Sequence, residues 1–226
     1  MESNSPGSSN QAIAGFIVRE SQPNTDPNSS FWIEASRVIA ESDFYGNPIR
    51  SHRTEILLQW TEKNLYLLFV CPYQELNLKP HPNLNEETYE LWNWDVAEVF
   101  IGDDFKNIRR YKEFEVSPQG EWVDLDVNLD NAPHEVGWVW KSGCEVAARI
   151  DAAEKIWYGF MRIPWPAIDN RPPAAGNELR INFYRCQGSD PDRKYITWRP
   201  VHRESFHRPE FFGTLRLTAR EDRLAL

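Results

Sequence analysis

Short runs in which apolar and polar residues alternate recur along most of the chain and predict β-strands. Two runs, Ile56 to Trp60 and Leu65 to Cys71, flank the polar turn TEKN, which is typical of a β-hairpin. Further runs of this kind occupy residues 95–102, 109–118, 121–128, 143–151, 156–164, 178–187, 194–200 and 213–219. No long amphipathic helix separates them, so the pattern favours antiparallel sheets over βαβ units.

These runs predict an all-β fold, an antiparallel β-sandwich of jelly-roll or immunoglobulin-like type with about ten strands and one or two short helices. One of these helices is expected in the segment FWIEASRVIA, where Trp32, Ala35 and Ile39 are at helical spacing. Ser29 or Ser30 is suited to cap it.

A chain of 226 residues is long enough for one large β-domain. Residues 1–12 are rich in Ser, Asn, Gly and Pro and are expected to be a disordered tail, followed by a single domain over 13–226. The first residues lack the basic and apolar regions of a secretory signal, and no apolar run approaches the roughly 18 residues of a membrane helix. We therefore expect a soluble protein without a visible export signal.

The charge balance narrows the range of partners. Acidic residues outnumber basic ones by 34 to 25, giving a formal net charge of −9, which disfavours nucleic acids and anionic membranes as partners. The three Cys lie far apart without CxxC spacing, so neither a zinc site nor more than one disulfide is expected. Neutral or cationic ligands fit this composition better.

Ten Trp are a large number for this length. Large aromatic side chains fill β-sandwich cores, but indoles also stack on sugar rings, so the Trp residues are expected to divide between core and ligand contacts. Trp198 lies within strand-like alternation and is assigned to the core.

Seven segments, taken in order, resemble carbohydrate-binding family 9 over about residues 12–218. They are NLYLLFVCP, LWNWDVAEVFIG, YKEFEVSPQGEWVD, YGFMRIPW, ELRINFYRCQ, ITWRP and SFHRPEFFGTLRL. The resemblance implies a β-sandwich related to DOMON domains that binds small sugars or the ends of polysaccharides. Such modules are often attached to xylanases and other glycoside hydrolases, which implies an extracellular or periplasmic location and a hydrolase as a possible separate partner.

The same resemblance implies a sugar clamped between two aromatic rings. It assigns the first ring to Trp92, a carboxylate to Glu98, and the second ring to Phe206, where characterised sugar-binding members carry a Trp. Phe offers a smaller stacking area, so either the ligand differs or the site is not a simple clamp. Trp94 is a possible substitute platform, and His207 is either a hydrogen-bonded loop residue or a partner for a sugar hydroxyl.

Strand alternation in DVAEVFIG places Glu98 on the same face as Val96 and Phe100. A carboxylate among apolar neighbours needs a partner, and Arg185 from the segment NFYR is the expected one. Two possibilities stay open: Glu98 and Arg185 hold the hydroxyls of a ligand together, or they form a structural ion pair.

The segment DLDVNLDNAPHE resembles a calcium loop by count. Its polar residues at positions 1, 3, 5, 7 and 12 are Asp124, Asp126, Asn128, Asp130 and Glu135. Position 6 is a Leu where an EF-hand has Gly, and no helices flank the segment, so an acidic, solvated strand is the simpler interpretation. We expect no cofactor and no catalytic residue, with structural calcium as a remaining alternative.

Four classes of function remain in consideration. A non-catalytic sugar-binding module that supports polysaccharide breakdown is favoured. A glycoside hydrolase needs two opposed carboxylates, which no motif singles out. A haem-binding electron carrier needs axial His and Met ligands, and Met161 is the one Met inside a predicted strand. The last alternative is a scaffold that has lost sugar binding.

Overall fold

The computed structural model describes residues 10–219. This part of the chain forms twelve strands and one four-residue α-helix, α1 (Trp165–Ile168). The strands are β1 (Gln11–Phe16), β2 (Ser36–Ala40), β3 (Thr54–Trp60), β4 (Asn64–Pro72), β5 (Val96–Gly102), β6 (Arg110–Val116), β7 (Trp122–Asn128), β8 (Glu145–Asp151), β9 (Ile156–Pro164), β10 (Glu178–Gln187), β11 (Lys194–Thr197) and β12 (Gly213–Thr218). Four short 3₁₀ turns complete it: η1 (Arg50–His52), η2 (Leu91–Asn93), η3 (His134–Trp138) and η4 (Pro209–Phe211). The predicted all-β class is confirmed.

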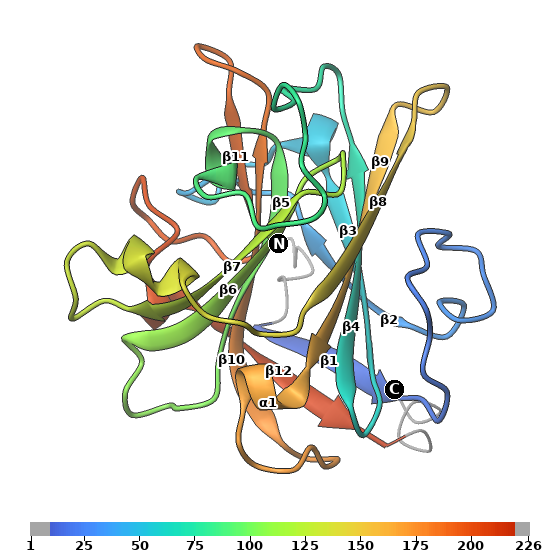
Figure 1. The fold of residues 1–226 in the computed structure, drawn as a ribbon, viewed down its shortest axis with the longest axis vertical. Coiled ribbons are helices and arrows are strands. Elements are labelled where there is room, and N and C mark those ends of the chain that lie inside the picture. Colours follow the sequence, from blue (N-terminus) through green and yellow to red (C-terminus); the bar gives the residue numbers. More distant parts are fainter. Residues whose placement is uncertain (1–9, 220–226) are drawn as a thin grey trace, which may run out of the picture.

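All twelve strands belong to one hydrogen-bonded sheet with the order β7-β6-β5-β10-β12-β1-β3-β4-β9-β8, while β11 pairs with β10 and β2 with β3 (Figure 1). Strand β1 pairs in parallel with both β12 and β3. The expectation of a wholly antiparallel arrangement is therefore wrong at this point. The first and last strands lie side by side and join the two halves of the sheet.

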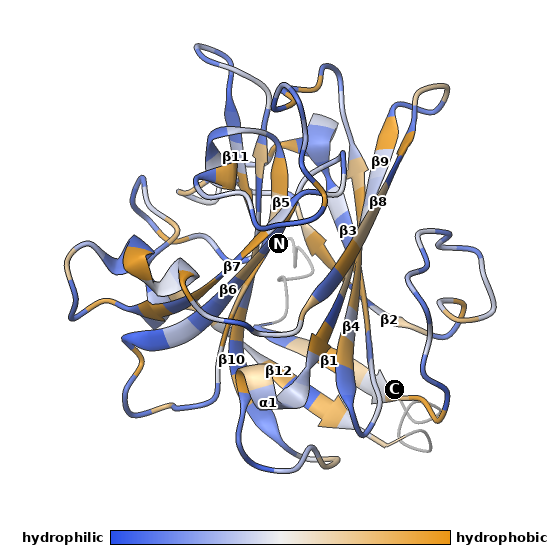
Figure 2. Cartoon of the chain, in the orientation of Figure 1, coloured by the Kyte–Doolittle hydropathy of each residue, from blue (hydrophilic) through white to orange (hydrophobic). Residues whose placement is uncertain are grey.

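The sheet curls back on itself and is nearly closed. Phe69 of β4 contacts Phe183 of β10 at 6.1 Å between ring centroids, although these strands are not neighbours in the sheet. The main core lies between the two halves, where the strands carry apolar side chains (Figure 2). The strand order describes a single curled sheet, and the narrower jelly-roll expectation stays a prediction.

The segment predicted as a helix around Trp32 is not helical. Successive turns, in which the amides of Trp32 and Ala35 donate to the carbonyls three residues earlier, lead into β2, which pairs with β3. Trp32 is fully buried on the outer face of the sheet against Phe160. The helical spacing of Trp32, Ala35 and Ile39 is a weaker determinant here than two tertiary interactions, the pairing of β2 with β3 and the burial of the Trp32 indole.

Strand β1 begins at Gln11, two residues inside the predicted tail, while residues 1–9 and 220–226 lie outside the described part of the chain. No helix among residues 10–219 is long and apolar enough to cross a membrane. Cys71, Cys144 and Cys186 are free thiols.

The predicted alternation in β5 determines which face of the sheet carries the candidate site. Ala97 and Val99 point into the main core, whereas Val96 and Phe100 belong to a second apolar cluster on the opposite face of β5, β6, β7 and β10. Loop residues including Val201 and Phe206 pack on this second cluster. Glu98 therefore lies on the face that the loops cover.

Candidate functional site

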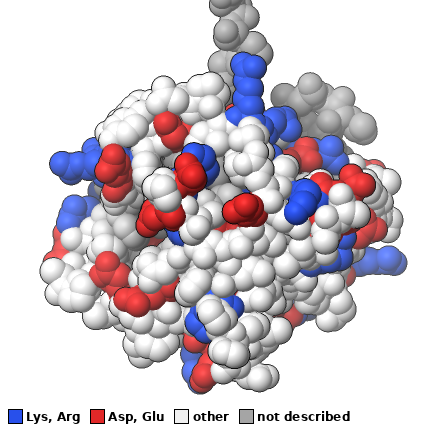
Figure 3. Space-filling model, turned by 90° about the horizontal axis from the view of Figure 1, so that it is seen from above, with Lys and Arg blue, Asp and Glu red and all other residues white. Residues whose placement is uncertain are grey.

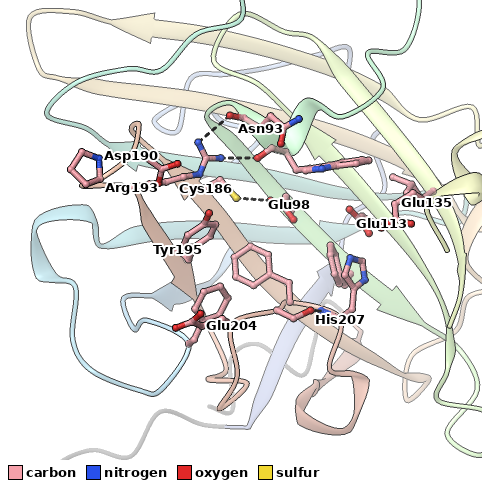
Figure 4. A pocket seen from close by; sticks show the side chains of 17 residues that line it. Asn93, Glu98, Glu113, Glu135, Cys186, Asp190, Arg193, Tyr195, Glu204 and His207 are labelled. Atoms are coloured by element: carbon pink, nitrogen blue, oxygen red, sulfur yellow. Dashed lines mark hydrogen bonds between the residues drawn. The ribbon is translucent and has the colours of Figure 1, made fainter. Parts of the chain in front are cut away.

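A cleft of about 730 Å³ opens between these loops and the outer face of β5, β6 and β10 (Figure 4). Aromatic side chains from η2, β5, β11 and the segment before β12 line it. They are Trp92, Phe100, Tyr195 and Phe206, joined by Phe44 from the β2–β3 connection. Polar lining comes from carboxylates, Asn93, Arg193 and His207.

Trp92 is presented by the turn η2, whose backbone is held by Arg193. The Arg193 guanidinium donates to the carbonyls of Trp92 at 2.7 Å, Trp94 at 2.9 Å, Asn93 at 3.1 Å and Gly188 at 2.9 Å. The Trp92 indole is half-buried and meets the ring of Tyr89 edge-on at 5.5 Å. Arg193 was not predicted from the sequence, because its role depends on carbonyl groups about 100 residues away.

Trp94 is half-buried and does not line the cleft, so its side chain is not placed to extend the surface offered by Trp92. Its contribution to the cleft is the carbonyl group that accepts from Arg193.

Phe206 lines the cleft but is only 9 % exposed. Its ring stacks on Tyr184 at 4.1 Å with an interplanar angle of 19°, and Phe44 lies 5.1 Å away. One face of the ring is therefore covered by protein. Tyr195 is more exposed, at 36 %, stacks on Phe44 at 5.0 Å and lines the same cleft (Figure 4). Sequence analysis missed Tyr195 because it alternates like an ordinary strand residue.

His207 lies at the cleft wall with its ring largely enclosed. Its Nδ1 atom and the Tyr111 hydroxyl share a hydrogen bond of 2.6 Å, and the ring of His134 lies 4.2 Å away. Burial, aided by His134, lowers the pKa of His207 from 6.5 to about 3. The imidazole is thus neutral near pH 7 and can act as a hydrogen-bonding group without charge.

The floor of the cleft carries an unexpected group of carboxylates. Glu98 on β5 pairs across the sheet with Glu115 on β6, and Glu113 is two residues from Glu115 on the same face. Oxygen atoms of the three side chains lie within 4.8 Å of one another, and each residue is at most 3 % exposed. Burial is the main reason that the pKa values of all three are raised above their ordinary range.

The sequence contained a partial signal for this group. Alternation in KEFEV places Glu113 and Glu115 on one face, but only the register of β5 against β6 brings them beside Glu98. Glu98 Oε1 accepts a hydrogen bond from the Cys186 thiol at 3.3 Å. Figure 4 shows Glu98 and Glu113 in the cleft.

Arg185 is not part of the cleft, and the predicted pairing with Glu98 is wrong. Glu98 lies opposite Tyr184 in the β5–β10 register, while Arg185 lies opposite Ala97 and thus points to the other face. There the buried Arg185 guanidinium donates to Thr54 Oγ1 at 3.2 Å and to Gln187 Oε1, and it lies 5.7 Å from the Trp157 ring centroid.

The acidic segment 124–135 does not converge on one point. Asp124 accepts from the Ser142 hydroxyl at 2.8 Å, Asp126 pairs with Lys112 at 2.5 Å, and Asp130 pairs with Arg109 at 2.6 Å. Residues 122–128 form strand β7, so the EF-hand-like count does not correspond to a loop.

Met161 is fully buried in the main core and does not face the cleft, which removes the Met ligand that a haem carrier would need there.

Comparisons with known proteins agree with the fold. The model of the family described as "Carbohydrate-binding family 9" matches residues 157–217. The fold is similar to a carbohydrate-binding module family 9 from Caldicellulosiruptor kristjanssonii, solved with glucose and with cellotriose, at TM-scores of 0.67 and 0.65 and 14 % identity. Each match covers 94 % of this chain, and 97 % or 95 % of the other. Residues 157–217 thus resemble carbohydrate-binding family 9 in sequence, and nearly the whole chain has a fold similar to that of a family 9 module.

A curated relative, an "Extracellular protein" of Arthroderma benhamiae, is 26 % identical over 173 residues, covering 71 % of this chain and 76 % of the relative. The family 9 resemblance deduced from seven segments thus extends to the fold of nearly the whole chain. The cleft thus combines the expected Trp92 with an almost fully buried Phe206 at the position where the resemblance implied the second ring.

Proposed function

We propose that the protein is a carbohydrate-binding module that holds a sugar or the end of a polysaccharide in the cleft beside Trp92, without breaking a bond. The observation that carries this proposal is the Trp92 indole, half-exposed at the cleft wall on a turn whose backbone Arg193 fixes. A rigid aromatic surface favours stacking with the CH face of a sugar ring, because little conformational entropy is lost on binding.

Polar groups in the cleft supply the selectivity. Glu98 and Asn93 line the cleft together with Trp92. Carboxylate and amide oxygens accept from sugar hydroxyls, and the amide nitrogen donates to them. A sugar that leaves these groups unpaired binds more weakly, since buried polar groups without partners cost free energy.

Tyr195 is the second ring of the proposed site. It is more exposed than Phe206 and lines the same cleft. We infer that the sugar packs between Trp92 and the aromatic group of Tyr195, Phe44 and Phe206, with Phe206 supporting the group from below rather than stacking alone.

The related structures hold glucose and cellotriose, so glucose and short β-glucans are the first ligands to test. The fungal relative is named as an extracellular protein, which supports an encounter with polysaccharides outside the cell. In that setting we propose that the module supports polysaccharide breakdown by a separate glycoside hydrolase.

Hydrolysis by the chain itself is the second candidate, because Glu98 and Glu113 both line the cleft. A glycosidase needs one carboxyl group that is protonated and another that is ionised. Burial raises the pKa values of both residues, and the charge of Glu98 raises that of Glu113 further. The two groups lie together on the cleft floor, with oxygens within 4.8 Å, and do not face each other across the cleft, which favours binding. Release of reducing sugar from cello-oligosaccharides by the purified chain would reverse the order of the two candidates.

The test is isothermal titration of the purified chain with glucose, cellobiose, cellotriose, xylose and galactose. We expect saturable heat for at least one sugar and a loss of affinity of about fivefold or more in Trp92→Ala, because stacking on one ring is worth about 1–3 kcal/mol. Trp94→Ala is the matched control, since it removes an indole two residues away whose side chain lies outside the cleft.

Affinity that survives in Trp92→Ala but falls in Trp94→Ala would contradict the assigned platform. Absence of heat for every sugar, in a chain that melts cooperatively, would contradict sugar binding and favour the scaffold alternative.

A further inference from the structure

We propose that Glu98, Glu113 and Glu115 form a binding site for one divalent cation, with Ca²⁺ as the preferred ion, at the floor of the cleft. This site goes beyond sugar binding and does not depend on it.

Glu115 provides the observation that requires a ligand. It is 1 % exposed, and apart from the neighbouring carboxyl group of Glu113 no group is placed to hydrogen-bond with its carboxylate oxygens. Glu113 Oε2 is buried and unpartnered as well. Such groups are rare, because an unsatisfied buried carboxylate loses its hydration without compensation. Both side chains belong to adjacent positions on one face of β6 and are directed toward Glu98.

The geometry suits a single ion. One oxygen from each Glu lies within 4.8 Å of the other two. Ca²⁺ binds oxygen at about 2.3–2.6 Å, so one ion contacts oxygens up to about 5 Å apart, whereas Mg²⁺ spans only about 4 Å. The carboxylates stand on neighbouring strands of one sheet, which fixes their spacing.

The remaining coordination positions are reachable from solvent. Glu98 and Glu113 line the cleft, so an ion enters through it and water completes its shell.

The charge around the cleft also favours a cation. Its lining includes five acidic side chains and one permanently charged basic side chain, Arg193, whose donors are directed at backbone carbonyls. The acidic residues are Glu98, Glu113, Glu135, Asp190 and Glu204.

The experiment uses the full chain after treatment with a chelator and removal of the chelator. Tb³⁺ is added in the absence of sugar, and its luminescence, sensitised by nearby aromatic rings, is followed to saturation. Ca²⁺ is then used to displace it, and direct titration with Ca²⁺ and Mg²⁺ gives stoichiometry and affinity. We expect one ion per chain, displacement of Tb³⁺ by Ca²⁺, and weaker binding of Mg²⁺.

Glu115→Gln keeps the shape of the side chain and removes its charge, and we expect Ca²⁺ affinity to fall at least tenfold. Asp124→Asn is the matched control: it also neutralises a buried carboxylate on a strand of this sheet, one opposite Phe114 on the main-core face, away from the three glutamates, and Ca²⁺ affinity should stay within twofold. Thermal unfolding establishes that both variants fold.

Three results would overturn the proposal: no saturable Ca²⁺ or Tb³⁺ binding, equal Ca²⁺ affinity in wild type and Glu115→Gln, or an equal loss in Asp124→Asn. Absence of ion binding together with a higher melting temperature for Glu115→Gln would show instead that the glutamates hold protons. Sugar titrations run separately on the same chelator-treated protein distinguish failure of this site from failure of sugar binding.

Discussion

Arg193 determines, at the scale of single residues, how Trp92 is presented. Four backbone carbonyls, those of residues 92, 93, 94 and 188, accept from one guanidinium. The planar fork of Arg makes several such bonds at once, which an ammonium group cannot reproduce.

We therefore expect Arg193→Lys to weaken sugar binding about tenfold by loosening the turn η2, while the fold is retained. Isothermal titration and thermal unfolding would check this, with the exposed Arg37→Lys as a control for charge-conserving substitution. Unchanged sugar affinity in Arg193→Lys would mean that η2 holds its shape without these bonds.

Single residues also show where sequence analysis succeeded and failed. Alternation alone was enough to place Glu98 on its face of the sheet. Whether Arg185 lies on the same face depends on the β5–β10 register, because a shift of one residue moves a side chain to the opposite face. Glu113, Tyr195 and Arg193 escaped notice because they line the cleft only through pairings and loops distant in sequence.

At the scale of elements, strands were predictable and their neighbours were not. The predicted runs from β3 to β12 correspond closely to observed strands, since buried β-branched and aromatic runs ended by turn residues carry a local signal. The parallel insertion of β1 between β12 and β3, and the pairing of β2 with β3, depend on contacts between distant segments. The expected helix at Trp32 failed for the same reason.

The close approach of β9 to β6 gives a test of how the sheet closes. A Cβ atom at Gly159 would lie 2.8 Å from Val116 Cγ1 and 2.9 Å from Trp157 Cζ3. We expect Gly159→Ala to destabilise the fold by about 1–3 kcal/mol through overpacking. Urea unfolding of the single variants and of Gly159→Ala with Val116→Ala would measure the coupling, and the second substitution should recover part of the loss. Strictly additive effects would contradict this packing.

At the scale of the whole molecule, the formal net charge of −9 includes buried as well as exposed acidic residues. On the face drawn in Figure 3, acidic and basic side chains are interspersed among uncharged ones, and neither sign forms a continuous patch there. The strongest electrostatic effects therefore arise inside the fold, at buried groups such as the floor glutamates and Arg185.

His52 links one of these buried groups to global stability. Burial lowers its pKa from 6.5 to about 4, and the positive charges of Arg185 and Lys194 add to this effect. Between about pH 6.5 and pH 4 the unfolded chain binds a proton at His52, whereas the folded chain does not. His52 therefore lowers the free energy of unfolding as the pH falls from 6.5 to about 4. At pH 5 the loss amounts to about 2 kcal/mol, since one pKa unit corresponds to about 1.4 kcal/mol.

His52→Asn has no titrating group and keeps a partner for the Ser51 hydroxyl, which lies 2.9 Å from His52 Nδ1. Urea unfolding at pH 7.5 and pH 5 should thus show a larger decrease in the free energy of unfolding for the wild type than for His52→Asn. Effects of the glutamates are common to both proteins and cancel in this comparison. Equal decreases would mean that His52 takes up its proton in the folded state, and that burial and the neighbouring positive charges of Arg185 and Lys194 do not lower its pKa.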